Sequence, residues 1–142
     1  MLLVDVNVLV YAHRERSPDH ERYREWVLGM MDRGNDYAMS ELVLSGFVRV
    51  VTNPRASADP TPIGVALQAA EDVLLRPNCR ILRPGPRHWR LFAWLCRDID
   101  ATGNDVADAY HAALAMEYGC EWITTDKGFA RFRGLRWRHP LN

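Results

Sequence analysis

The chain has 142 residues, of which 48% are hydrophobic and 25% charged, and its formal net charge is zero. This composition is typical of a globular protein, excludes a disordered chain, and gives no bulk electrostatic sign of a polyanionic partner. The three cysteines (Cys79, Cys96 and Cys120) are odd in number and far apart, which argues against a disulfide framework or a paired-cysteine zinc site. We expect residues 1–142 to form a single domain.

The sequence shows no membrane or export signal. No apolar run approaches the roughly 20 residues that span a bilayer. The stretch before Asp5 has no Lys or Arg, whereas a signal peptide begins with a basic region. Together with the unpaired cysteines, which suit a reducing compartment, these features predict a cytoplasmic protein with no membrane segment.

The first predicted strand covers residues 2–6, at the start of the apolar run "LLVDVNVLVYA". A strand this apolar is typical of one buried on both faces. An ionised carboxylate is costly there, so Asp5 requires a partner that compensates its charge.

Helical and strand patterns alternate along the rest of the chain. Ser17 and Ser40 are predicted N-caps, and Pro18 suits the first position of a helix. Helices are predicted over residues 18–33, 41–51, 63–75, 87–97 and 104–119, the last with Asn104 as its cap. Further strands are predicted over residues 37–39, 80–82, 122–125 and 135–138.

This alternation predicts an α/β fold: a parallel sheet of four or five strands, with helices on both faces. In such sheets, ligands bind outside the carboxyl ends of the strands, where the strand order reverses. Asp5 lies near the carboxyl end of the first strand and is therefore expected to face such a site.

Four acidic residues fall at strand ends or helix starts. Asp5 ends the first strand, Glu41 follows the second, Asp108 lies in the first turns of an alanine-rich helix, and Asp126 follows the fourth strand. Each has an ordinary structural interpretation: Glu41 and Asp108 complement helix dipoles, and Asp126 begins a turn. As a set at one edge they would repel one another.

A divalent cation removes that repulsion. Mg²⁺ and Mn²⁺ are bound by few carboxylates and retain water molecules for chemistry. With phosphate oxygens completing its coordination, such an ion activates water and neutralises a leaving oxygen. We therefore favour a metal site formed by Asp5, Glu41, Asp108 and Asp126.

Three polar residues are candidates for supporting roles. Asn7 lies two residues beyond Asp5, on the same face if the strand continues. Thr124 lies two residues before Asp126 and can hydrogen-bond a carboxylate of the site. Asp105 shares a helix face with Asp108 and is either an outer acid of the site or an ordinary first-turn aspartate.

Histidine and arginine add weaker signals. No histidine pair has metal-ligand spacing, so we assign the histidines no catalytic role. Several arginines are candidates for contacts with RNA phosphates; they are Arg14, Arg16, Arg49, Arg55, Arg131 and Arg133. Trp89, Phe92 and Trp94 share one helix and exceed a single core stripe, which favours a partner surface.

Four segments resemble PIN-domain proteins, and VapC-type toxins of toxin–antitoxin pairs most of all. They are "DVNVLVYA", "SELVLSGFVRVVTNPR", "ATGNDVADAYHAALAMEYG" and "ITTDKGFARFRGLRW", in order over nearly the whole chain. Each segment alone is unspecific, but four in register are strong evidence. In this resemblance Asp5, Glu41, Asp108 and Asp126 match the acidic quartet of the family, and Asn7 and Thr124 match its supporting positions.

The resemblance implies a Mg²⁺- or Mn²⁺-dependent endoribonuclease with an α/β/α sandwich fold. It also implies a homodimer that is inhibited by a VapB-type antitoxin, one end of which binds DNA while the other inserts into a groove of the toxin. The RNA remains open among transfer, ribosomal and messenger RNA.

Two alternatives remain. One is an aspartyl-phosphate phosphotransferase, but those enzymes require a D-x-D pair, and position 7 is Asn. The other is a catalytically silent PIN-fold module that binds antitoxin or RNA without turnover.

Overall fold

Five short parallel strands form one sheet in the computed structural model, which describes residues 1–142. They are β1 (Leu2–Val4), β2 (Tyr37–Met39), β3 (Cys79–Ile81), β4 (Glu121–Ile123) and β5 (Trp137–Arg138). Their order is β3-β2-β1-β4-β5, and every neighbouring pair is parallel. The predicted parallel α/β fold is therefore confirmed, with five strands, and the strand order reverses at β1.

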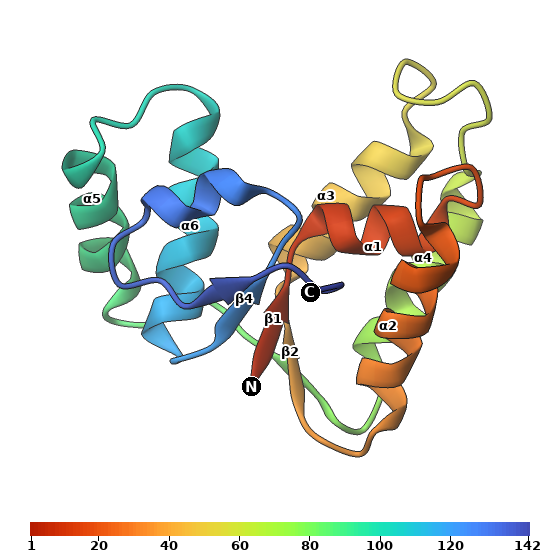
Figure 1. Ribbon diagram of the computed structural model, residues 1–142, viewed down its shortest axis with the longest axis horizontal. Coiled ribbons are helices and arrows are strands. Elements are labelled where there is room, and N and C mark those ends of the chain that lie inside the picture. Colours follow the sequence, from red (N-terminus) through yellow and green to blue (C-terminus); the bar gives the residue numbers. More distant parts are fainter.

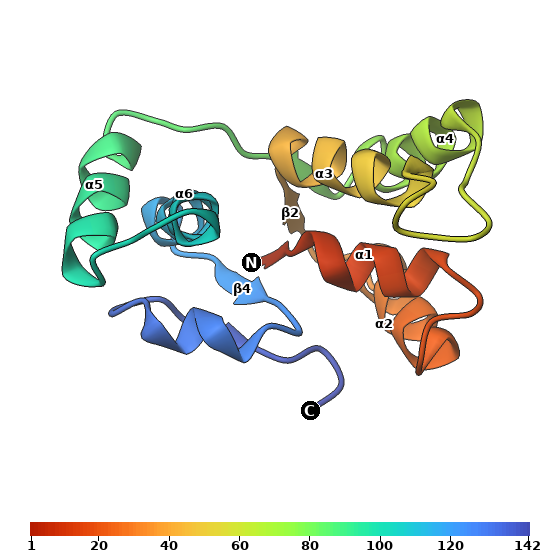
Figure 2. The same ribbon diagram turned by 90° about the horizontal axis from the view of Figure 1, so that it is seen from above.

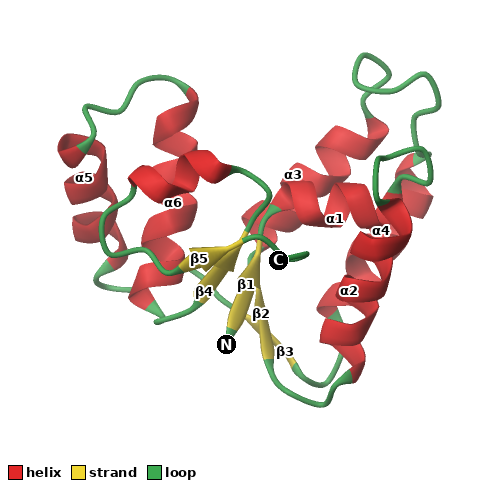
Figure 3. Cartoon of the chain, viewed as in Figure 1, coloured by secondary structure: helices red, strands yellow, loops and turns green.

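Helices cover the sheet on both sides. They are α1 (Val6–His13), α2 (His20–Asp32), α3 (Glu41–Thr52), α4 (Ile63–Leu74), α5 (His88–Asp98) and α6 (Asn104–Glu117), followed by the short 3₁₀ helix η1 (Lys127–Arg131). The sheet lies between α1–α4 on one side and α5 and α6 on the other (Figures 1 and 3). The view from above shows the same three layers (Figure 2). No helix is long and apolar enough to cross a membrane.

The largest departure from the sequence prediction is α1. The first strand ends at Val4 rather than residue 6, and α1 begins directly after Asp5. Asp5 is the N-cap, since its Oδ1 accepts a hydrogen bond from Val6 N at 2.7 Å. The valine-rich sequence of this helix favours a strand by propensity, and its burial between neighbouring elements overrides that preference. The prediction that Asn7 continues a strand face is therefore wrong.

Other helix starts differ by a few residues. The second helix begins at His20 and not at residue 18, so Ser17 and Pro18 lie in a turn before it. Asp19 at its N-cap has a positive φ of 57° and makes no capping bond. Asn104 is the first residue of α6 rather than its cap, because Gly103 holds that position with a φ of 55°. By contrast, Ser40 caps α3 as predicted, accepting from Leu42 N at 3.2 Å.

Small residues bring the acid-bearing elements close together. Ala109, Ala112 and Ala113 on α6 are fully buried, so the helix packs closely in the core. On α3, a Cβ at Gly46 would lie 3.0 Å from Val6 Cγ2 of α1. Glycine is therefore the residue that permits this close approach of α1 and α3.

Candidate active site at the carboxyl edge of the sheet

Asp5 directly follows β1, next to β4, at the point where the strand order reverses. Figure 1 shows α1 leaving the carboxyl end of β1, and Asp5 is the one residue between these two elements. The backbone N–H of Asp5 donates to Ile123 O of β4 at 2.9 Å. Only 7% of the residue is exposed, so its carboxylate is placed by the junction of β1, β4 and α1.

Burial changes the acidity of Asp5. Its pKa is raised from 3.8 to about 6, mainly by desolvation and to a smaller extent by the charges of Asp108 and Asp126. Hydrogen bonds from the Thr124 side chain and Val6 N act in the opposite direction, since they stabilise the ionised form. A carboxylate that is costly to ionise beside two other carboxylates is stabilised by a bound cation.

This pKa predicts a dependence of stability on pH in metal-free buffer. The folded protein binds the Asp5 proton more tightly than the unfolded chain does. The free energy of unfolding therefore falls as pH rises from about 4 through about 6, by roughly 2–3 kcal/mol from this group. The Asp5→Asn variant lacks this contribution, so in urea titrations with EDTA its stability relative to wild type should increase across that interval. A difference that is constant with pH would contradict the assignment.

Thr124 links two acidic residues. Its side chain is fully buried. Oγ1 donates to Asp5 Oδ2 at 2.6 Å and accepts from Asp126 N at 3.0 Å. Because β4 ends at Ile123 and not at residue 125 as predicted, Thr124 belongs to the turn that follows the strand. The hydroxyl therefore sets the position of Asp5 relative to the Asp126 backbone.

Asp126 is held by the backbone that follows it. Its Oδ1 accepts from Gly128 N at 2.7 Å and caps η1. A Cβ at Gly128 would lie 2.8 Å from Asp126 Oδ1 and 2.7 Å from Arg131 Nη1. The absence of a side chain at position 128 therefore lets Asp126 and Arg131 share this turn.

Asp105 and Asp108 lie on one face of α6 and both accept hydrogen bonds from the guanidinium of Arg131. Arg131 Nη2 donates to Asp108 Oδ2 at 2.8 Å and to Asp105 Oδ1 at 3.1 Å. Asp105 Oδ2 also accepts from Thr102 N at 3.3 Å. From the sequence, Arg131 was only a candidate for RNA contacts. Its pairing with two aspartates of another element is set by the tertiary fold and has no local sequence signal.

Glu41 and Asn7 stand apart from this group. Glu41 follows the Ser40 cap and pairs with Arg83, whose Nε donates to Oε1 at 2.8 Å. Its side chain is 56% exposed. Asn7 lies exposed in the first turn of α1. Of the predicted acidic quartet, the structure thus brings the charges of Asp5, Asp108 and Asp126 together and directs Glu41 to an arginine.

The donor chemistry at this edge fits a hard divalent cation, since carboxylate oxygens are the ligands that Mg²⁺ and Mn²⁺ prefer. The ligand geometry is not complete, because no three His, Cys, Asp or Glu side chains surround a common point as ligands. Asp108 is instead held by Arg131 and Glu41 by Arg83. Each arginine contacts one oxygen of its carboxylate, Oδ2 of Asp108 and Oε1 of Glu41.

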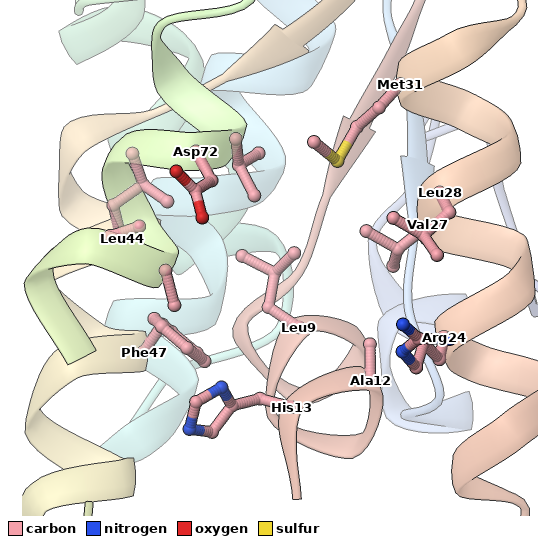
Figure 4. Close-up of a pocket in the computed structure, with 13 residues that line it drawn as sticks. Leu9, Ala12, His13, Arg24, Val27, Leu28, Met31, Leu44, Phe47 and Asp72 are labelled. Atoms are coloured by element: carbon pink, nitrogen blue, oxygen red, sulfur yellow. The ribbon is translucent and has the colours of Figure 1, made fainter. Parts of the chain in front are cut away.

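A mostly apolar groove of about 260 Å³ lies among α1, α2, α3 and α4 (Figure 4). Leu9, Ala12 and His13 of α1 lie between residues of α2 and residues of α3 and α4. Arg24 and Asp72 supply opposite charges to its lining. The groove lies on the side of the sheet covered by α1–α4. One of these helices, α1, begins directly after Asp5.

These features define a PIN fold with an acidic site at the carboxyl edge of its sheet. The PIN domain family model matches residues 2–135, so the chain belongs to the PIN-domain family. Ribonuclease VapC43 of Mycobacterium tuberculosis is 49% identical over 142 residues, which are 100% of this chain and 97% of that protein. Ribonuclease VapC25 of the same species is 36% identical over 140 residues, 99% of each chain.

Solved structures show the same fold at low sequence identity. VapBC2 from Rickettsia felis, bound to a DNA fragment from their promoter, aligns with a TM-score of 0.72 at 20% identity, covering 97% of each chain. FitAcB from Neisseria gonorrhoeae aligns with a TM-score of 0.68 at 18% identity, covering 99% of this chain and 98% of that one.

Proposed function

We propose that this protein is a metal-dependent endoribonuclease, the toxin of a VapBC-type toxin–antitoxin pair, formed by a single PIN domain over residues 1–142. The observation that carries the proposal is the buried Asp5 carboxylate, whose pKa is raised by burial and by the charges of Asp108 and Asp126. The full-length similarity to proteins named VapC ribonucleases, at up to 49% identity, supports the same reaction on RNA phosphodiester bonds.

In this mechanism Asp5, Asp108, Asp126 and Glu41 would hold Mg²⁺ or Mn²⁺. When bound, the ion supplies activation of water for in-line attack and neutralises the leaving oxygen. Thr124 fixes the orientation of Asp5 and couples it to Asp126. Asp105 acts as an outer acid next to Asp108, and Asn7, exposed in the first turn of α1, orients RNA or water. No covalent intermediate is expected, because water and not a side chain of the protein is the proposed nucleophile.

The proposed partners occupy different surfaces. A VapB-type antitoxin would insert an apolar segment into the groove among α1–α4, where Arg24 and Asp72 lie among the lining residues. A second copy of this chain would cover Trp89 and Trp94 of α5, which are 69% and 43% exposed. The three free cysteines agree with a cytoplasmic location, where RNA substrates are found.

One observation favours a second candidate, a PIN-fold module that binds antitoxin or RNA without turnover. Asp108 and Glu41 each pair with an arginine, and no metal-ligand cluster is formed. An assay of turnover separates this candidate from the nuclease.

The purified protein should be incubated with transfer, ribosomal and messenger RNA in Mg²⁺, in Mn²⁺ and in EDTA. The nuclease proposal predicts cleavage of at least one RNA with metal and none with EDTA, and sequencing of the new ends identifies the target. RNA that is bound but stays intact in both metals would favour the binding module instead.

A further inference from the structure

Arg131 bridges two acidic residues of α6, Asp105 and Asp108. It ends η1, and its Nη2 donates to carboxylate oxygens of both Asp105 and Asp108, at 3.1 and 2.8 Å. Nη1 donates to the backbone oxygen of Gly128 within the same turn. The side chain is 29% exposed, so these contacts lie partly out of water, where charge-assisted hydrogen bonds are stronger.

The guanidinium of Arg131 has one donor without a partner. Its Nε is buried with no acceptor in the protein. The guanidinium carbon lies 4.6 Å from the centroid of the Phe132 ring, a cation–π contact. The two carboxylates of α6 are the anionic partners of Arg131 in this position, and Arg131 in turn offsets the repulsion between them.

We propose that Arg131 is an internal counter-ion that occupies the acidic site before a divalent ion binds, and that the ion must displace it from Asp108. This inference rests on the proposed function, because it assigns Asp108 as a metal ligand. Arg131 is then a positioning residue: it keeps the ion-free site ordered and raises the metal concentration at which the site fills.

Removing the Arg131 charge should have two opposite effects. The ion-free protein loses its counter-ion for Asp105 and Asp108, so its melting temperature should fall. The ion no longer competes with a guanidinium, so Mn²⁺ affinity should rise by threefold or more. Damage to the fold alone would lower the melting temperature and weaken metal binding together, which makes the tighter binding diagnostic of competition.

The experiment measures Mn²⁺ binding by calorimetry on the full chain at fixed pH and ionic strength. Arg131→Met and Arg131→Gln should both bind Mn²⁺ at least threefold more tightly than wild type, and Arg131→Lys should lie between them and wild type. The matched control is Arg138→Met, which removes the same charge from a half-exposed pair with Glu121 on β4 and should leave Mn²⁺ affinity unchanged.

Two failures are distinguishable. If wild type binds Mn²⁺ and cleaves RNA but a folded Met or Gln variant binds Mn²⁺ equally or more weakly, the counter-ion role is wrong and the proposed function stands. If wild type neither binds Mn²⁺ nor cleaves RNA, the proposed function fails, and this inference fails with it. Equal tightening in the Arg138→Met control would overturn the specific role of Arg131.

Discussion

Replacing Asp5 with asparagine is expected to reduce RNA cleavage by about a thousandfold, since the loss of a buried anionic ligand removes several kcal/mol of stabilisation from the metal-assisted transition state. The fold should survive, because the amide keeps an oxygen that can accept from Val6 N or from Thr124 Oγ1. Cleavage of a fixed RNA in Mg²⁺, compared at equal concentrations of folded protein, measures the effect.

A matched control for this substitution is Asp36→Asn. Asp36 precedes β2, at the opposite edge of the sheet, and pairs with Arg80 at 2.9 Å on the surface. The Asp36→Asn substitution removes one carboxylate charge from the chain without changing the acidic site. The cleavage rate of this variant should therefore equal that of wild type. Full activity of Asp5→Asn would remove Asp5 from the mechanism.

The second large effect is expected from Thr124→Val, which has nearly the same shape as threonine but lacks the hydroxyl. Asp5 Oδ2 loses its donor in a buried position, and the backbone N of the exposed residue Asp126 loses its acceptor. An unsatisfied buried group costs roughly 1–3 kcal/mol of stability. Loss of a group that orients a ligand typically lowers metal affinity or activity by about 10- to 100-fold.

Urea titration and Mn²⁺ calorimetry on the same sample measure the two consequences of Thr124→Val. Thr125→Val is the control, since the Thr125 side chain is only partly buried and makes no hydrogen bond within the protein. If Thr124→Val and Thr125→Val have the same Mn²⁺ affinity, Thr124 does not position the acidic site.

The parts of the fold that follow from local rules agree with the sequence prediction. Parallel strands alternating with helices, the Ser40 cap of α3 and the buried alanine face of α6 all follow from residue patterns within single elements. The helix α1 does not, because residues 6–13 are rich in valine and have no polar face to reveal a helical period. Asp5, predicted to end a strand, in fact caps that helix.

The acidic site shows the same division. The location of the acidic site at the carboxyl edge of the sheet follows from the positions of Asp5, Asp108 and Asp126 at the ends of predicted elements. The partners of its side chains do not, since Arg131 with Asp108 and Arg83 with Glu41 are pairs between segments distant in sequence. Such pairs depend on how the turn after β4 and the connection after β3 are oriented, and no local pattern encodes that orientation.

The proposed nuclease requires that Asp5, Asp108, Asp126 and Glu41 bind a divalent ion. Diffraction from crystals soaked in Mn²⁺, recorded at a wavelength where manganese scatters anomalously, tests it directly. One or two anomalous peaks bounded by these carboxylates are expected, with Asp108 turned away from Arg131. Fully soaked crystals that show Asp108 still paired with Arg131, and no peak at the carboxyl edge, would contradict it.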